Sequence, residues 1–304
     1  MKKRVFVIAI SFCISLISFA QDTTDVSKLL EAQLKAEDVN KTQLVTATFK
    51  TTRLINGHTV ETAAKGVLDV KISHRFDPIG GSDGGAYNFF GLDKATMRLG
   101  FDYGLTNRLM IGIGRSTIGK IFDGFFKVKI LRQATGKKAM PVTLDYVPTI
   151  AVISLRNPGV YTNLSRRISI THQLIIGRKF SEGLSLQFMP SVVHRNFPVD
   201  KGVQNIWALG AGGRQKLSKR TSIDFEYYYQ LPDYKVPGSR NSLSVGFDIE
   251  TGGHVFQVHL TNSLGMTESV FIPQTFHSWA KGEFSIGFNI SRVFSVNKKH
   301  NKDW

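Results

Sequence analysis

Acidic side chains recur at alternate positions in several otherwise apolar segments of this 304-residue chain. Asp224 and Glu226 stand two residues apart among aliphatic and aromatic neighbours, so a strand would place both carboxylates on one face. Two carboxylates in a dry core are costly, whereas a polar lumen satisfies them with water or opposite charges. The spacing therefore predicts the inner wall of a barrel and not a soluble core.

Basic residues in other segments have the same spacing and could supply the opposite charges. The residues that we expect to line the lumen are Arg98, Asp102, Lys127, Lys129, His172, Asp224 and Glu226. The formal net charge of +16 would also suit an anionic partner. Export, argued below, excludes nucleic acid, and basic loops and a basic lining explain the charge.

Catalytic and metal chemistry find little support in the pattern. His172, and His194 near Asp200, could serve as a general base, but no nucleophile signature accompanies them. His254 and His259 are five residues apart on a strand, so they project to opposite faces and cannot share a metal ion. We expect no enzyme activity, no metal and no bound cofactor.

The strand near the end of the chain is the longest alternating element. From Phe284 to Phe294, large residues alternate with small and polar ones for eleven residues. A tilted strand needs about 9 to 11 residues to cross a membrane. Strands of soluble sandwiches alternate in the same way but are usually nearer five or six residues long. Phe284, Phe288, Ile290 and Phe294 would form a C-terminal signal for barrel assembly.

The first 20 residues have the features of a secretory signal peptide. Lys2, Lys3 and Arg4 precede an apolar run, and Ser18 and Ala20 are the small residues that signal peptidase requires, so cleavage is expected after Ala20. Cys13 lies inside the apolar run and would leave with it. The mature chain would then contain no cysteine, which excludes disulfides and thiol chemistry.

Twelve strands follow in series, and their connections alternate in length. We expect them at about residues 65–76, 94–105, 108–117, 124–133, 141–154, 167–178, 183–195, 202–217, 221–231, 240–250, 253–263 and 281–294. Short turns would lie on one side and long loops on the other, as in outer-membrane barrels. Fourteen strands would require residues 44–54 to pair as a thirteenth strand and one more strand in addition to those twelve.

The remaining segments complete the predicted organisation. Residues 1–20 form the signal peptide and residues 21–64 a periplasmic segment with a short helix and a strand or hairpin, turning at Asn56-Gly57. Residues 65–295 form the outer-membrane barrel, and residues 296–304 a basic tail. The even strand number puts both termini in the periplasm.

Several longer strings give the chain a family resemblance. They are residues 74–76, 89–93, 112–115, 193–196, 210–214, 226–229, 246–256 and 288–294. On these strings the chain resembles an uncharacterised family of bacterial outer-membrane β-barrel proteins. The resemblance covers nearly all of the chain after residue 44. It implies an all-β, transmembrane antiparallel barrel and brings no activity, substrate or site.

Two functions compete on these grounds, and a third ranks last. The first is a channel or uptake protein for a small solute, with a basic lining that would favour anions. The second is a structural or assembly partner whose lumen is closed by side chains or by the N-terminal segment. The third is an outer-membrane hydrolase. The expected partners are outer-membrane lipid, lipopolysaccharide, the barrel-assembly machinery and a periplasmic or outer-membrane protein.

Overall fold

The computed structural model describes residues 41–81, 84–198 and 202–296. The predicted signal peptide, the predicted lead-in helix before residue 41 and the predicted basic tail after residue 296 lie outside the described residues. No helix within those residues is long and apolar enough to cross a membrane.

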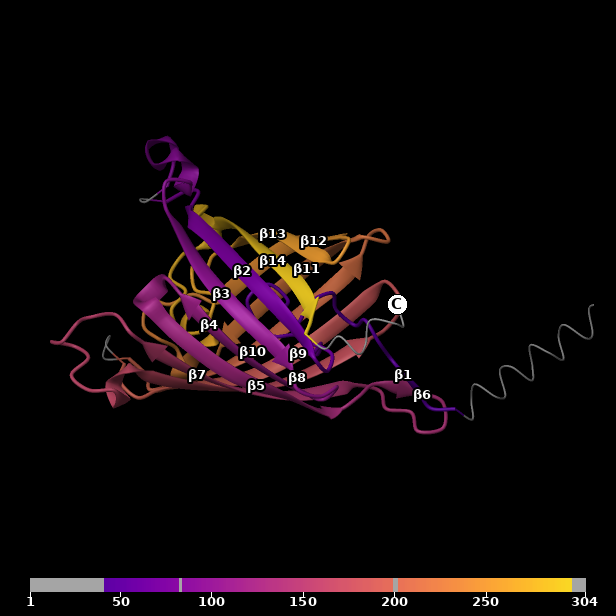
Figure 1. The fold of residues 1–304 in the computed structure, drawn as a ribbon. Coiled ribbons are helices and arrows are strands. Elements are labelled where there is room, and N and C mark those ends of the chain that lie inside the picture. The colour runs from indigo at the N-terminus through magenta and orange to yellow at the C-terminus, as the bar shows by residue number, and fades with distance from the viewer. Residues whose placement is uncertain (1–40, 82–83, 199–201, 297–304) are drawn as a thin grey trace, which may run out of the picture. The chain divides into compact units, whose positions relative to one another are not determined.

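Twelve antiparallel strands close into one barrel, which Figure 1 shows from the side. Each strand pairs with the next in the chain, and the last pairs with the first. The strands are β2 (Val67–Pro78), β3 (Ala95–Gly104), β4 (Leu109–Ser116), β5 (Ile121–Leu131), β7 (Thr143–Ile153), β8 (Ile168–Lys179), β9 (Leu184–Arg195), β10 (Asn205–Lys216), β11 (Thr221–Gln230), β12 (Ser242–Thr251), β13 (His254–Thr261) and β14 (Ser285–Ser295). The prediction of twelve strands is confirmed, with strand ends within four residues of those expected.

The two faces of the wall differ in chemistry, as a membrane-spanning barrel requires. Exposed side chains on the strands are largely aliphatic and aromatic, for example Ile113, Phe122, Phe247 and Val258. The alternate positions point into the lumen and carry most of the buried charges. An apolar exterior suits lipid, and the closed sheet leaves no strand edge open to it.

Strand order divides the connections between the two ends of the barrel, and the predicted contrast in length holds except for residues 132–142 among the short turns and residues 117–120 among the long loops. Residues 105–108, 132–142, 180–183, 217–220 and 252–253 connect strands at one end, here called the turn end. Residues 79–94, 117–120, 154–167, 196–204, 231–241 and 262–284 connect them at the other, the loop end. The described barrel begins and finishes at the turn end.

The barrel closes between β14 and β2. Residues from Ser285 to Ser295 pair with residues from Pro78 to Val67, with a register shift between Ser285 and Gly287. The prediction that the last strand contacts both its sequence neighbour and the first strand is confirmed. Phe284 lies just before β14 and stacks on Trp279 at a ring separation of 4.8 Å.

The other elements within the described residues are short. They are the 3-10 helices η1 (Ala86–Gly91), η2 (Ile118–Lys120), η3 (Ser165–Arg167), η4 (Pro232–Tyr234) and η5 (Trp279–Lys281), and the one-turn helix α3 (Glu268–Phe271). Separately, β1 (Gln43–Leu44) and β6 (Ala134–Thr135) form a two-stranded sheet.

Candidate functional site in the barrel lumen

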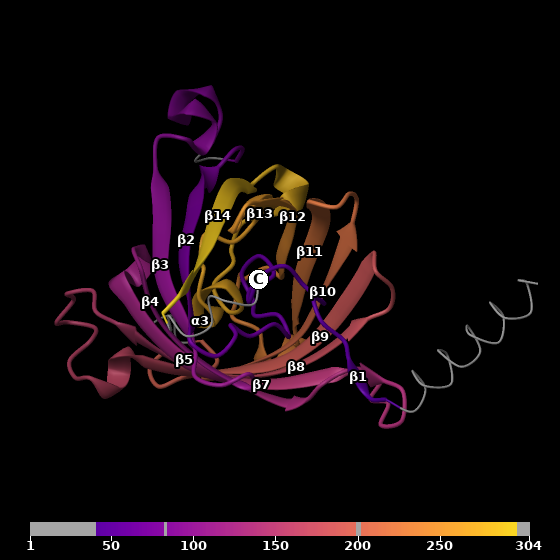
Figure 2. The same cartoon turned by 45° about the vertical axis from the view of Figure 1, so that its right-hand side comes forward.

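Residues 44–64, here called the plug, run inside the barrel. Figure 2 looks toward the barrel opening and shows this indigo segment folded within the ring of strands. Nearly every residue from Thr52 to Val60 is buried, and Arg53 bridges His58 in an antiparallel pair around the Asn56-Gly57 turn. The plug enters the lumen from the turn end and returns to the same end to begin β2.

Glu226 of β11 holds the tip of the plug. Its carboxylate accepts backbone hydrogen bonds from Gly57 at 2.8 Å, Asn56 at 3.2 Å and Ile55 at 3.3 Å. The fit is close, because a Cβ at Gly57 would lie 2.1 Å from the Tyr228 hydroxyl oxygen. Consecutive backbone amides of this kind form anion-binding sites in many proteins. Here the amides belong to the plug and the anion is a carboxylate of the barrel wall, so the hydrogen bonds are charge-assisted.

The opposite side of the tip contacts polar residues of β2, β12, β13 and β14. The Asn56 side chain donates to Ser244 at 3.1 Å and accepts from Arg75 at 2.9 Å. Asn289 donates to the Ile55 carbonyl at 3.0 Å, and Gln257 donates to the Leu54 carbonyl. The plug backbone, lacking strand partners here, therefore pairs with wall side chains.

Lys127 of β5 joins the two limbs of the plug. Its Nζ donates to the carbonyl oxygens of Thr52 at 3.0 Å, Thr59 at 2.9 Å and Glu61 at 2.9 Å. An ammonium has three N–H donors, so the protonated form can serve all three carbonyls. The positive charge of Lys127 on the wall is thus stabilised by the partial negative charges of plug carbonyl oxygens.

Helix α3 meets the plug from the loop end. Glu268 accepts a hydrogen bond from Arg53 at 2.8 Å, and its Oε1 is 3.6 Å from His58 Nε2. Burial, and then the nearby charge of Arg53, lower the pKa of His58 well below its usual value. His58 is therefore neutral near pH 7 in the seated plug. One buried ion pair connects segments that enter the lumen from opposite ends.

Apolar side chains pack around these polar contacts. One buried cluster joins the plug residues Phe49, Leu54, Val60 and Ala63, the wall residues Met110, Phe125, Val147, Ile175, Met189, Val193, Ile206, Ala208 and Tyr228, and the loop residues Val236, Phe271 and Ile272. Phe271 of α3 packs edge-on to Tyr228 at 5.0 Å. Arg75, Lys127 and Tyr228 are 0% exposed. Plug, α3 and cluster together exclude solvent from the middle of the lumen.

Six of the seven residues predicted to line the lumen are buried on its inner wall. Arg98 pairs with Asp123, with Nε to oxygen at 2.9 Å. Asp102 accepts from Lys71 at 2.9 Å and from the plug residue Thr52 at 3.1 Å. Lys127 and Glu226 bind the plug directly, whereas Lys129 and Asp224 lie on the same inner face without a hydrogen bond to it in the described structure.

The placement of His172 in the lumen was wrong. Its neighbours Thr171 and Gln173 are buried on the inner face, and His172 is exposed on the outer face. There its Nδ1 lies 2.7 Å from the Tyr146 hydroxyl, and the rings stack. His194 also points outward, 2.7 Å from Asn205. Neither histidine is placed to act as a base toward a solute in the lumen.

The prediction missed the residues that hold the plug from the other walls and from the loops. Arg75, Asn289 and Gln257 could have been identified, since each is polar at an inward position of an alternating strand. Arg53 and Glu268 lie in segments without periodicity, and no local signal marks their meeting. Among the described residues, no group of three or more His, Cys, Asp or Glu is arranged to hold a metal ion.

Comparisons with known proteins agree with the barrel architecture. A family model described as "Membrane bound beta barrel domain (DUF5777)" matches residues 49–294, which include most of the plug. Among curated proteins, no sequence matches the chain.

Similar solved structures include two porins and a channel. The NanC porin is 10% identical, with a TM-score of 0.45 over 74% of this chain and 98% of that chain. The KdgM porin is 9% identical, with a TM-score of 0.44 over 75% and 99%. An outer membrane channel from Pseudomonas putida F1 is 13% identical, with a TM-score of 0.44 over 77% and 97%.

Proposed function

Since the chain belongs to this family of membrane-bound β-barrels, we propose that it is an outer-membrane uptake channel for a small solute, closed at rest by its own plug. The observation that carries the proposal is the plug: a segment from outside the sheet fills the lumen and is held by side chains of the wall. With the turn end in the periplasm, the plug would move toward the periplasm to open the path.

The contacts of the plug suit a segment that can leave. Beyond Leu44, which belongs to β1, no strand pairing joins the described part of the plug to the wall, since the bridge between Arg53 and His58 is internal. Most polar contacts join one wall side chain to plug backbone, and water can replace such bonds. Several inward atoms, including both carboxylate oxygens of Asp145 and Asp224, have no protein hydrogen-bond partner. After release of the plug, water or a polar solute could donate hydrogen bonds to these oxygens.

Charge on the inner wall indicates a polar path without a strong preference for one sign. Among the buried inward residues of the described wall, bases and acids are equal in number: Lys71, Arg75, Arg98, Lys127, Lys129, Arg195 and Arg214 against Asp69, Asp102, Asp123, Asp145, Asp224, Glu226 and Asp248. The basic lining expected from composition is therefore not found, and the excess positive charge lies elsewhere. Selectivity for anions needs another source.

A reversible cross-link between plug and wall tests the proposal. A Cβ at Gly177 of β8 would lie 3.3 Å from Cβ of Val60, near the separation of about 3.5–4.5 Å that disulfides adopt. The double variant V60C/G177C should therefore tether the plug. We expect slow solute flux through liposomes carrying the reduced variant, at a rate set by spontaneous release of the plug, and little flux after oxidation.

The single variants V60C and G177C are the matched controls, and oxidation should leave their flux unchanged. Equal flux through oxidised and reduced double variant would contradict a path closed by the plug. The channel function would be refuted if the wild type, the reduced variant and the plug-loosening variants all showed no flux.

A second function is favoured by the same closure. A lumen filled from both ends by the plug and α3 suits a structural or assembly partner that transports nothing. This function predicts that recovery from intact outer membranes yields a stoichiometric protein partner, and that loosening the plug produces no flux. Flux that depends on plug release would exclude it.

A further inference from the structure

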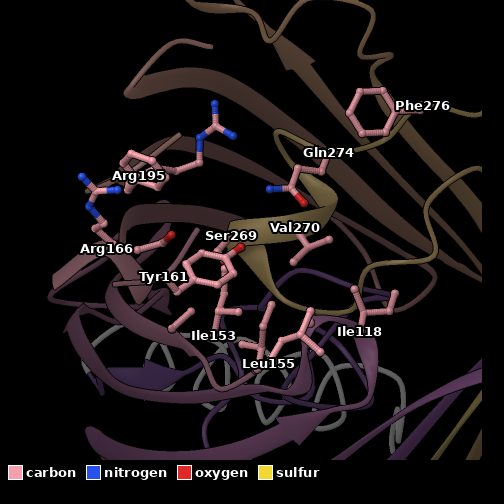
Figure 3. Close-up of a pocket in the computed structure, with 15 residues that line it drawn as sticks. Ile118, Ile153, Leu155, Tyr161, Arg166, Arg195, Ser269, Val270, Gln274 and Phe276 are labelled. Atoms are coloured by element: carbon pink, nitrogen blue, oxygen red, sulfur yellow. The ribbon is translucent and has the colours of Figure 1, made fainter. Parts of the chain in front are cut away.

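A cavity lies at the loop end of the barrel, beside α3. Its volume is about 420 Å³, within the range of about 300–1,000 Å³ that small-molecule sites occupy. The walls come from residues 118–121, the end of β7, residues 161–169, residues 195–197 and the α3 loop. Figure 3 shows Tyr161, Arg166 and Arg195 on one side of this cavity, and Val270 and Gln274 on the other.

The floor of the cavity is apolar. Ile121, Ala151 and Val270 form a buried cluster, and Ile118 and Ile153 pack against it. Leu155 and Phe276 extend the same lining. A surface of this kind binds an aliphatic or aromatic body, since burying apolar area is favourable and roughly proportional to that area.

One side of the cavity is cationic. The Arg166 guanidinium lies over the Phe197 ring at 4.2 Å, an arrangement that holds its planar fork in place. Arg195 lies on the same side, with Nη2 donating to the Val203 carbonyl at 2.8 Å. Among the described lining residues there is no aspartate or glutamate. The field inside the cavity therefore favours an anion.

We propose that this cavity binds a hydrophobic monocarboxylate, with the carboxylate at Arg166 and the apolar body over Ala151 and Val270. A guanidinium pairs with a planar carboxylate through two parallel hydrogen bonds. A cation would be repelled, and a neutral hydrocarbon would leave the arginine without a partner. The role of this cavity as the entry site of a channel rests on the proposed function. The binding of a carboxylate does not depend on that function.

The cavity is next to the contact that holds the plug. Ser269 and Val270 line it, and the preceding residue, Glu268, binds Arg53 of the plug. A ligand packed against Val270 therefore acts on α3 one residue from that ion pair.

Calorimetric titration of decanoate into the full-length protein in nanodiscs tests the assignment, with empty nanodiscs as the blank. Decyltrimethylammonium, which has the same tail and opposite charge, is the control ligand. We expect saturable binding of decanoate, at least tenfold weaker binding of the cation, and about tenfold weaker decanoate binding to Arg166→Gln. Ala151→Phe should fill the cavity and abolish binding.

Arg115→Gln is the matched control variant, because Arg115 also stacks on a phenylalanine, Phe122 at 5.1 Å, but on the outer face. It should bind decanoate as the wild type does. Equal affinity for the two ligands, or wild-type affinity in Arg166→Gln, would overturn the assignment. Saturable binding without any plug-dependent flux would support the binding site and refute the channel function. Flux without saturable binding would refute only the binding site.

Discussion

Replacing Glu226 by glutamine should loosen the plug while changing almost no volume. The carboxylate serves the amides of Ile55, Asn56 and Gly57. A glutamine oxygen in the Oε2 position can still accept from all three amides, but the bonds become neutral and the NH₂ group takes the Oε1 position, where it faces the Asn56 N–H without an acceptor. Hydrogen bonds to a charged group contribute about 1.5–3 kcal/mol and neutral ones about 0.5–1.5 kcal/mol, and a buried orphaned donor costs about 1–3 kcal/mol.

The sum for Glu226→Gln is about 3 kcal/mol in favour of the released plug, or about 100-fold in the release equilibrium. Amide hydrogen exchange of peptides covering residues 52–60 measures this directly, because released amides exchange and seated ones do not. Asp224→Asn is the matched control, since Asp224 is two residues away on the same face and its neighbours Arg214, Ser222 and Asp248 belong to the wall. Exchange within twofold of wild type in Glu226→Gln would refute the assigned role.

Three further outcomes follow from the same contacts. Gly57→Ala places a Cβ 2.1 Å from the Tyr228 oxygen and should raise amide exchange of the plug about tenfold or more, whereas Gly159→Ala, where a Cβ has its nearest neighbour at 3.8 Å, should not. Because burial lowers the pKa of His58, this histidine binds a proton below pH ~6.5 when the plug is released but stays neutral when the plug is seated. Release should therefore increase on acidification, by up to about 30-fold at pH 5, and His58→Gln should flatten this dependence; a pH-independent exchange rate in the wild type would contradict it. Phe294→Asp, at an outward position paired with Leu68, should lower outer-membrane levels of the protein, while deletion of residues 297–304 should not; wild-type levels of the aspartate variant on membrane immunoblots would remove the assembly role.

The barrel could be predicted because lipid imposes strict rules on strands. An outward apolar residue at every second position and alternating connection lengths are both visible in one sequence, and they gave the strand number and the closing partner of β14. His172 is a case where the same rule was not followed. In β8 it shares its face with Ile168, Ile170, Leu174 and Ile176, so the alternation itself places His172 outward and Gln173 in the lumen.

The plug, and the wall and loop residues that bind it, could be predicted only in part. Leu54, the Asn56-Gly57 turn and Val60 indicate a short apolar hairpin, and residues 44–54 were expected in a hairpin on the periplasmic or lumen side. Its depth depends on Glu226, Lys127 and Glu268, which are distant in sequence and meet only through closure of the sheet. Such contacts leave no periodic signal, because they join a loop to three separate elements.

The central claim is that residues 44–64 fill the lumen, and disulfide formation in V60C/G177C within intact bacterial outer membranes tests it most directly. The mature chain is expected to contain no other cysteine, so non-reducing mass spectrometry reports a single bond. The structure predicts nearly complete disulfide formation between positions 60 and 177, because their Cβ atoms would lie 3.3 Å apart. Free, alkylatable thiols at both positions would contradict a plug seated in the barrel.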